Sequence, residues 1–205
     1  MKRGRFITFE GIDGAGKSTQ LAFLAQHLRT RGIDALMTRE PGGTPLGEKL
    51  RELVLSVDMD PRTETLLMFA ARAEHLAQVI RPALAAGRWV VCDRFSDATF
   101  AYQSGGRQLP GESVEALERW VHPDLEPDLT LLVDLPPEIA AQRLATARAA
   151  DRFEAQQTEF FTRVRDAYLA RAARSPQRFV ILDGTQSPQA IQERIAAVLA
   201  DAAAA

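Results

Sequence analysis

One glycine-rich segment limits what this chain can fold into more than any other part of the sequence. It reads Gly11-Ile12-Asp13-Gly14-Ala15-Gly16-Lys17-Ser18, directly after the apolar run Ile7-Thr8-Phe9 and directly before an amphipathic stretch. This order matches the Walker A pattern between a strand and a helix, which opens the P-loop class of α/β folds. The glycines let the backbone curl with its N–H groups pointing inward, so the segment predicts a cradle for phosphate groups.

The last two residues of this loop carry the most specific part of the signal. We expect Lys17 to lie at the surface of the cradle and to reach the β- and γ-phosphates of ATP, and Ser18 to ligate Mg²⁺. The helix that begins near Lys17 adds the positive end of its dipole. A glycine-rich turn that merely precedes a helix is the alternative, and the Lys-Ser pair at the correct spacing disfavours it.

Apolar runs that are typical of strands alternate with amphipathic segments along the chain. The strand predictions are Phe6–Phe9, Ala35–Thr38, Trp89–Cys92, Leu129–Asp134 and Phe179–Leu182. The helix predictions are Ser18–Arg31, Leu46–Leu55, Thr63–Ala86, Ser113–Val121, Pro137–Ala147, Gln156–Ala173 and Pro188–Ala200. Strands separated by helices predict an α/β fold in which a five-stranded parallel sheet carries helices on both faces.

Composition is that of an ordinary globular protein and narrows the possible partners. The 205 residues suit one domain, and no repeat or linker divides residues 1–205. A net charge of −2 gives no support for binding to nucleic acid or to a membrane surface. No apolar run is long enough to span a bilayer, no signal-peptide region precedes the first strand, and the single Cys92 cannot form an internal disulfide. These features favour a cytoplasmic location.

A Walker A pattern alone does not separate the many classes of P-loop protein. A GTPase would need Asn-Lys-x-Asp to read guanine, and the sequence contains no asparagine. A motor or transport ATPase would usually be larger and carry subdomains that contact partners. A short chain with scattered arginine-bearing segments favours a kinase that acts on a small molecule.

Four further polar segments follow predicted strands or lie on helices beside them. They are Thr38–Thr44, Phe69–His75, Asp93–Phe95 with the following Ala101–Gly106, and Asp151–Glu154. In open α/β sheets, ligands bind at the edge where the carboxyl ends of the strands meet. We therefore expect these segments to form the acceptor side of the site.

In combination these motifs are highly specific, although each alone would be weak. Walker A, Arg39-Glu40-Pro41-Gly42-Gly43-Thr44, Ala70-Ala71-Arg72, Asp93-Arg94-Phe95 and Ala101-Tyr102-Gln103 occur in consistent order between Phe6 and Leu182. The chain resembles the thymidylate kinase family in its bacterial form. The resemblance implies a P-loop nucleoside monophosphate kinase fold and the Mg²⁺-dependent phosphorylation of dTMP to dTDP by ATP, in dTTP biosynthesis. It also implies a homodimer packed through helices.

The resemblance assigns the acceptor phosphate and the catalytic centre to charged residues. Arg51 and Arg94 correspond to the clamps on the dTMP phosphate, and guanidinium groups suit a phosphate because they bind it bidentately. Asp93 corresponds to a carboxylate near Mg²⁺ and the transferring phosphoryl group, so Ser18 and Asp93 are the expected metal ligands. Glu40 lies where the family places a carboxylate near the sugar and the active centre. Lys17, Asp93 and Arg94 are expected to be catalytic.

The resemblance also implies how the nucleoside is recognised. Arg72 and Gln103 correspond to the pair that hydrogen-bonds the thymine edge. Tyr102 corresponds to a tyrosine that crowds the ribose 2′ position and so favours a deoxy sugar. Thr99 is expected near the base.

The chain departs from the family pattern at the residue that stacks on the base. The family usually has a phenylalanine four residues before the arginine of this helix, where the chain has Met68, and Phe69 comes one residue later. A helix turns by about 100° per residue, so either Phe69 reaches the base face or Met68 packs on it. We take Phe69 as the stacking candidate.

A lid is the expected source of a further catalytic arginine. Some family members carry a basic residue inside the P-loop, where this chain has Asp13, and the resemblance then implies an arginine from a flexible lid. Residues 143–154 provide Arg143, Arg148 and Arg152. An arginine that closes over the γ-phosphate stabilises spreading charge, by ~10³ or more in rate. We favour Arg148 and Arg152.

Two other interpretations stay open from the sequence. The chain could be a P-loop kinase for another nucleoside monophosphate, against which Tyr102 and Gln103 argue. It could also be a module that binds nucleotide without catalysis, but such a module would not need clamps for an acceptor phosphate. His75 is expected to be structural, as a lone histidine usually is, and the three histidines and Cys92 show no metal-ligand spacing. The only metal expected is Mg²⁺.

Overall fold

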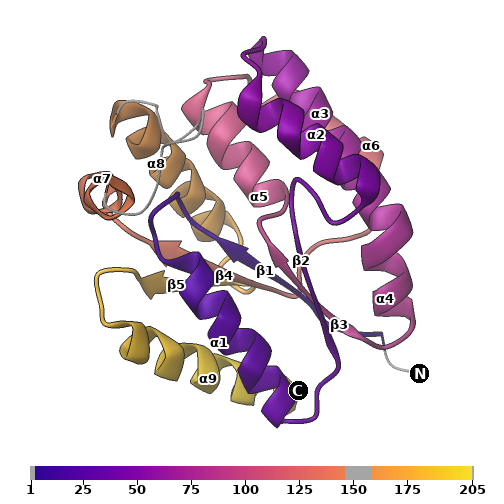
Figure 1. Ribbon diagram of the computed structural model, residues 1–205, viewed down its shortest axis with the longest axis vertical. Coiled ribbons are helices and arrows are strands. Elements are labelled where there is room, and N and C mark those ends of the chain that lie inside the picture. The colour runs from indigo at the N-terminus through magenta and orange to yellow at the C-terminus, as the bar shows by residue number, and fades with distance from the viewer. Residues whose placement is uncertain (1–2, 146–157, 205) are drawn as a thin grey trace.

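The computed structural model describes residues 3–145 and 158–204, and its centre is a sheet of five parallel strands (Figure 1). The strands are β1 (Phe6–Glu10), β2 (Ala35–Arg39), β3 (Trp89–Asp93), β4 (Leu129–Asp134) and β5 (Phe179–Asp183). They lie in the order β2-β3-β1-β4-β5, and every adjacent pair is parallel. The predicted five-stranded parallel sheet is therefore confirmed.

Helices cover both faces of this sheet (Figure 1). The helical segments are α1 (Lys17–Thr30), α2 (Pro45–Ser56), α3 (Pro61–His75), η1 (Leu76–Ile80), α4 (Arg81–Ala85), α5 (Ser96–Thr99), η2 (Phe100–Gly106), α6 (Gly111–Val121), α7 (Pro137–Ala145), α8 (Thr158–Arg174) and α9 (Pro188–Ala204), where η marks a π-helical segment. α1 and α9 pack side by side on one face, and α3 to α6 and α8 lie on the other. Within the described ranges, no helix is long and apolar enough to cross a membrane.

Apolar side chains pack against both faces of the sheet. Phe6 and Val90 are fully buried in a cluster with side chains of η1 and α4. Ile7, Phe9 and Val91 alternate with them along the strands and join a cluster that includes side chains of α1 and α9. Burial of each such side chain contributes about 1.5–3 kcal/mol, so both helical layers help to fix the sheet.

Short sequence signals set where α2 and α3 begin. Thr44 precedes α2, and its Oγ1 accepts a hydrogen bond of 2.9 Å from the N–H of Gly47. Asp60 precedes α3 and accepts one of 2.8 Å from the N–H of Arg62. Each helix then starts with proline, which suits the first position because its missing N–H would be unpaired there.

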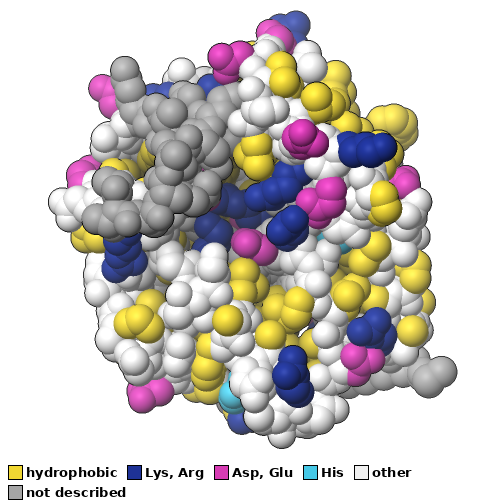
Figure 2. Space-filling model, viewed as in Figure 1, with side chains coloured by type: hydrophobic (Ala, Val, Ile, Leu, Met, Phe, Trp, Pro, Cys, Tyr) yellow, Lys and Arg dark blue, Asp and Glu magenta, His cyan; other side chains and the backbone are white. Residues whose placement is uncertain are grey.

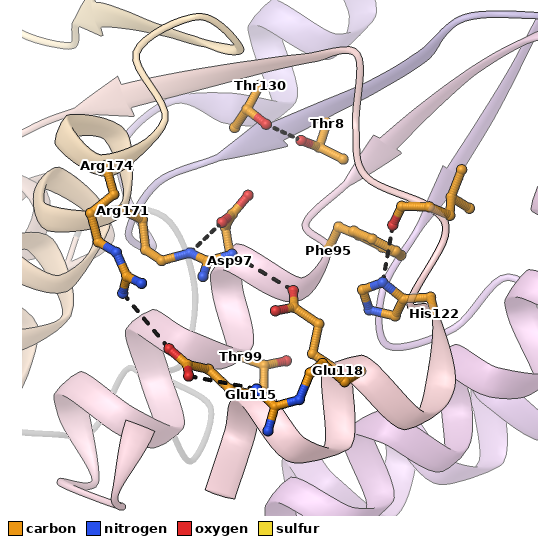
Figure 3. A network of polar contacts seen from close by, with 12 residues as sticks. Thr8, Phe95, Asp97, Thr99, Glu115, Glu118, His122, Thr130, Arg171 and Arg174 are labelled. Carbon is orange, nitrogen blue, oxygen red and sulfur yellow. Dashed lines mark hydrogen bonds and ion pairs between the residues drawn. The ribbon is translucent and has the colours of Figure 1, made fainter. Parts of the chain in front are cut away.

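No helix was expected over residues 96–106, but α5 and η2 fill this stretch, which carries several of the expected site residues. Its first turn is held by Asp97, whose buried carboxylate accepts hydrogen bonds of 2.8 Å from Arg171 and 2.7 Å from Arg178. Figure 3 shows Arg171 of α8 reaching between Asp97 and Glu118 of α6. Because these partners are distant in sequence, no local pattern indicates the helix.

The carboxyl ends of β1, β2 and β3 meet at one edge of the sheet. Asp93 is in register with both Phe9 and Arg39. The N–H of Glu40 donates to the carbonyl of Asp93, and the N–H of Arg94 donates to that of Phe9. The residues that follow these strands therefore lie together beside the glycine-rich loop, at the edge where open α/β sheets bind ligands.

Candidate active site

The glycine-rich loop between β1 and α1 has a backbone that requires its glycines. Gly11, Gly14 and Gly16 have φ values of 136°, 81° and 90°, which residues with a Cβ rarely adopt. A Cβ on Gly11 would also lie 2.5 Å from the carbonyl oxygen of Val133 in β4. Gly16 leads directly into α1, so the loop ends at a helix N-terminus, which favours bound anions.

Lys17 was expected at the surface of the cradle, and the structure instead buries it, with 8% of the residue exposed. Its Nζ donates hydrogen bonds of 3.0 Å to the carbonyl oxygens of Gly11 and Ile12. Burial and the charge of Arg94 lower the pKa of Lys17 to about 8, against the opposing effect of Asp13. The ammonium group is thus held inside the loop, where enclosed phosphates would meet it.

Asp13 belongs to this loop, but its side chain contacts residues of the expected acceptor side. Its Oδ1 accepts a hydrogen bond of 2.6 Å from Arg94 Nη2, and its Oδ2 accepts one of 2.7 Å from the hydroxyl of Tyr102. Burial opposes ionisation of Asp13, but the charges of Arg94 and Lys17 outweigh it and lower the pKa to about 2. The sequence pattern predicts Asp13 only as a nucleotide-binding residue and gives no sign of this bridging position.

A cleft opens beside the loop. Its lining residues are Asp13, Glu40, Pro41, Arg51, Leu55, Met68, Arg72, Arg94, Phe95, Ala98, Thr99, Tyr102 and Gln103. Figure 2 shows a hollow on this face in which basic side chains gather next to acidic ones. Every residue that the resemblance implies for the acceptor lines the cleft, except Phe69.

Phe69 is the exception because it faces the interior. It is only 2% exposed and packs with Phe100 and Val114. The guanidinium carbon of Arg72 lies 4.8 Å from the centre of the Phe69 ring, so Phe69 stabilises Arg72 through a cation–π contact. Met68, and not Phe69, lines the cleft. It lies one helical turn before Arg72 and therefore shares the face of α3 that Arg72 presents. The expectation that Phe69 stacks on the base is corrected accordingly.

Paired substitutions test this correction. We expect Met68→Ala to raise the KM for the acceptor nucleotide about three- to tenfold, because it removes apolar contact of ~1 kcal/mol from the cleft. Phe69→Ala should instead lower the free energy of unfolding by about 3–5 kcal/mol, as the loss of a buried phenylalanine does. KM and thermal unfolding would be measured for both. A stable Phe69→Ala protein with a raised KM, beside an unaffected Met68→Ala protein, would restore Phe69 as the stacking residue.

Arg72 is fixed in the cleft wall by two buried contacts. Its Nε donates to Glu40 Oε2 at 2.7 Å, and its Nη2 donates to Thr99 Oγ1 at 2.9 Å. Burial opposes ionisation of Glu40, but the charge of Arg72 and the hydrogen bonds with His75 and Arg72 together outweigh it and lower the pKa of this carboxyl. Among the described residues, Arg72 Nη1 finds no hydrogen-bond partner although it is buried. Such a donor in a cleft wall is suited to a hydrogen-bond acceptor on a ligand.

His75 holds Glu40 from the other side. Potential metal-ligand atoms of Glu40, His75 and Cys92 lie within 4.8 Å of one another. However, Nδ1 of His75 is 3.0 Å from Glu40 Oε1, and Nε2 is 2.7 Å from Thr38 Oγ1. A histidine that binds a metal needs one ring nitrogen for the ion. These contacts use both nitrogens, which supports the structural role expected for His75.

Arg51 and Arg94 both line the cleft, and their charges act on each other. Arg51 reaches the cleft from α2, where its Nη1 donates to the carbonyl of Pro41 at 3.0 Å. Burial, followed by the charges of Arg39 and Arg94, lowers the pKa of Arg51. An anion between two guanidinium groups would relieve this repulsion and accept their hydrogen bonds.

Two residues that the sequence analysis missed hold Arg94 in place. Arg94 has a φ of 70°, a left-handed conformation that costs about 1–3 kcal/mol for such a residue. Glu10 Oε1 accepts a hydrogen bond of 2.7 Å from the N–H of Phe95, and Oε2 accepts one of 2.8 Å from the hydroxyl of Tyr168. Arg94 Nη1 in turn donates to the Tyr168 hydroxyl at 3.3 Å. Glu10 therefore holds the backbone at Phe95 directly, and it holds the guanidinium group of Arg94 through Tyr168.

Glu10 had a sequence signal that could have been used, because it is the one charged residue of the buried strand β1. Burial, with the charge of Asp97, raises the pKa of Glu10 to about 8. Tyr168 had no such signal, since it lies on α8, far away in the sequence.

Ser18 and Asp93 line one groove next to the loop. In the part of the chain that the structure describes, Asp93 Oδ1 is buried without a hydrogen-bond partner. Carboxylate and hydroxyl oxygens are donors that suit Mg²⁺. The residues present therefore fit the ion that the sequence predicts.

The expected lid arginines are only partly described. Arg148 and Arg152 lie outside the described residues. Arg143 is on α7, and its Nη2 donates to the carbonyl of Gly184 at 3.0 Å. Its Nη1 lies 4.0 Å from the position that a Cβ would take on Gly16. Arg143 therefore reaches the P-loop.

Comparison with known proteins agrees with this geometry. A family model described as thymidylate kinase matches residues 9–195. The chain belongs to the thymidylate kinase family. A thymidylate kinase of Methylobacillus flagellatus is 61% identical over 193 residues, which cover 94% of this chain and 95% of that relative. The thymidylate kinase of Burkholderia vietnamiensis is 57% identical over 204 residues, with 98% and 99% covered.

A solved thymidylate kinase has the same fold. The crystal structure of thymidylate kinase from Ehrlichia chaffeensis aligns with a TM-score of 0.78 at 33% identity, covering 96% of this chain and 99% of that one. The sheet and its helices are accordingly a P-loop nucleoside monophosphate kinase fold. As a member of the thymidylate kinase family, the chain is a nucleotide kinase, and the interpretation as a binding module without catalysis is set aside.

Proposed function

We propose that this chain transfers the γ-phosphate of ATP to dTMP, giving dTDP for the synthesis of dTTP. The observation that carries the proposal is the contact of 2.6 Å between Arg94 Nη2 and Asp13 Oδ1. It joins the phosphate-binding loop to the cleft that holds Arg51 and Arg72. A donor in the loop and an acceptor in the cleft would therefore present their phosphates to each other, as in-line transfer requires.

Different basic residues bind the phosphates of ATP and the phosphate of dTMP. Lys17 contacts the β- and γ-phosphates of ATP, and Arg51 and Arg94 hold the phosphate of dTMP. Their charges screen the repulsion between two anions and stabilise charge that develops on the transferring group. The transfer is direct and forms no covalent enzyme intermediate.

Mg²⁺ accompanies ATP in this proposal, and Ser18 and Asp93 would hold it. When bound, the ion supplies charge neutralisation at the phosphate oxygens. The buried Oδ1 of Asp93, which lacks a partner among the described residues, supports this assignment.

Recognition of the nucleoside is assigned to other residues that line the cleft. Arg72 and Gln103 bind the thymine edge, and the buried Nη1 of Arg72 is a donor suited to thymine O4. Glu40 and Thr99 act with them by holding Arg72 in position. Tyr102 excludes a 2′-hydroxyl on the sugar.

The acceptor is tested with a panel of nucleoside monophosphates in an assay for ADP release. We expect dTMP to be used far better than dCMP, dGMP or dAMP, with dUMP a poorer second substrate. A site built to hydrogen-bond one base edge disfavours another by ~10⁴ when buried groups are left unpaired. Equal rates on dCMP and dTMP would favour the alternative, a kinase for another nucleoside monophosphate.

The sugar preference is tested at Tyr102. We expect Tyr102→Ala to narrow the gap between ribo- and deoxyribothymidine monophosphate by about tenfold, because the space beside the 2′ position opens. Tyr102→Phe is the matched control. It keeps the ring, so the preference for the deoxy over the ribo substrate should stay. It should raise the KM for dTMP, since it removes the hydrogen bonds of the hydroxyl with Asp13 and Arg94. An unchanged gap in Tyr102→Ala would remove the tyrosine from sugar recognition.

We also infer a homodimer and a cytoplasmic location. Apolar side chains are exposed on neighbouring helices: Leu46 and Leu53 on α2, Leu66 on α3, and Trp120 on α6, the last at 81%. Exposed apolar side chains of this kind support packing of helices against a second copy. Cys92 is buried as a free thiol, which suits a reducing compartment.

A further inference from the structure

We propose that Glu64 sets the base specificity of this kinase by fixing which end of the Gln103 side-chain amide faces the acceptor cleft. The proposal rests on the proposed function, in which Gln103 contacts the base. Glu64 is on α3 and is completely buried, and it is not among the residues that line the cleft. It would therefore act through Gln103, as a positioning residue.

The contacts of Glu64 determine the orientation of the amide. Gln103, on η2, donates from Nε2 to Glu64 Oε1 at 2.8 Å. Arg107 Nη2 donates to the other oxygen, Oε2, at 3.3 Å. A carboxylate paired with a guanidinium offers acceptor oxygens to its remaining neighbours. Turning the amide over would place Gln103 Oε1 against Glu64 Oε1, and two acceptors at that distance repel each other.

The fixed amide leaves one end for a ligand. Gln103 is 1% exposed, and it lines the cleft. With Nε2 directed at Glu64, the opposite end of the amide, the acceptor Oε1, is the end left for a bound base. Arg72 lines the same cleft with a buried donor, Nη1, that is unpartnered among the described residues. The cleft therefore combines one acceptor with one donor.

This combination distinguishes pyrimidines by their hydrogen-bonding edges. Thymine presents an acceptor at O4 and a donor at N3–H, which complement Arg72 Nη1 and Gln103 Oε1. Cytosine presents the reverse, a donor amine at C4 and an acceptor at N3. A bound cytosine would leave buried polar groups facing groups of the same kind, which is costly. Uracil has the same edge as thymine, so Glu64 would act against cytosine alone.

The test compares kcat/KM for dTMP and dCMP in the full chain and in its Glu64→Gln variant. Glutamine has nearly the same shape, but its amide can donate or accept, so the Gln103 amide would no longer have one favoured orientation. We expect the preference for dTMP over dCMP to fall about tenfold or more, partly through faster use of dCMP. An unchanged preference, or equal losses on both substrates, would overturn the proposal.

Two further variants separate specificity from general damage. Thr65→Val alters the neighbouring buried residue, whose hydroxyl donates to the carbonyl of Pro61 at 2.8 Å. It perturbs α3 without changing the Gln103 amide, so it should keep the preference. The double variant with Glu64→Gln and Gln103→Glu exchanges the two groups and again presents an acceptor to the cleft. It should regain the preference, and a folded double variant that lacks it would contradict the proposal even if Glu64→Gln alone does not fold.

The same measurements separate this inference from the proposed function. Wild-type protein without a preference for dTMP would contradict the proposed function itself. Wild-type protein with the preference, beside a Glu64→Gln variant that keeps it, would contradict only the role of Glu64.

Discussion

Replacement of Lys17 with alanine is expected to lower kcat by ~10³ or more while the protein still folds. Transfer of a phosphoryl group depends on fixed charges close to the γ-phosphate, and the substitution removes the ammonium group that the loop holds there. The carbonyls of Gly11 and Ile12 that lose their hydrogen bonds belong to the loop, so the strands and helices keep their packing. Steady-state kinetics and thermal unfolding of the variant test both parts of the prediction.

A matched control is available for this substitution. Lys49 is exposed on α2, and Lys49→Ala removes the same charge from the surface. Its kcat should stay within about twofold of wild type, because an exposed charge is largely screened by water and salt. Normal turnover in a folded Lys17→Ala protein would show that the loop is not the phosphate site.

Alanine at Arg148 or at Arg152 is expected to lower kcat by about 10³ with only a modest effect on the KM for dTMP. Asp13 leaves the P-loop without an arginine of its own, so charge on the transferring group must be neutralised from elsewhere. An arginine that makes its contact mainly in the transition state supplies a factor of this size. Such an interaction appears in kcat, whereas an interaction made equally in the ground state appears in KM. Steady-state kinetics on each variant, with both substrates varied, test whether the loss appears in kcat and not in KM.

Arg94→Ala supplies the contrast for the lid variants. Arg94 lines the acceptor cleft and is held there by Asp13 and Tyr168 without any ligand. It would bind the acceptor phosphate before transfer begins, so its loss should raise the KM for dTMP as well as lower kcat. If both lid variants keep wild-type kcat, the catalytic charge must come from Arg143, which already reaches the P-loop, or from the acceptor clamps.

The sheet and the phosphate loop could be predicted because their signals are local. Each strand is a short apolar run, and the glycines that allow the loop to turn stand beside one another in the sequence. The residues expected on the acceptor side could be predicted to lie together because they follow strand ends or occupy a motif, and the structure brings all of them except Phe69 to one cleft. Met68 and Phe69 show the limit of this reasoning, because one residue of difference on a helix decides between the cleft and the core.

The rest depends on contacts between distant parts of the chain. α5 and η2 lie in a stretch that includes Asp97, and their first turn is held by Arg171 and Arg178. The support of Arg94 by Glu10 requires Tyr168 on α8. No spacing or periodicity encodes such partners, since they become neighbours only when the chain has folded. The same holds for Glu64, whose partner Gln103 lies on another helical segment.

The support of Arg94 has a thermodynamic consequence for the acceptor site. A free arginine side chain has many rotamers, and ordering it costs about 2 kcal/mol of conformational entropy. Arg94 already contacts Asp13, Tyr102 and Tyr168, so this loss accompanies folding and not the arrival of substrate. If Arg94 binds the acceptor phosphate as proposed, the affinity would gain by up to this amount, because the binding group is already ordered. A substitution at Glu10 or Tyr168 would return part of that disorder to the binding step without removing a contact to the ligand, because neither residue lines the cleft.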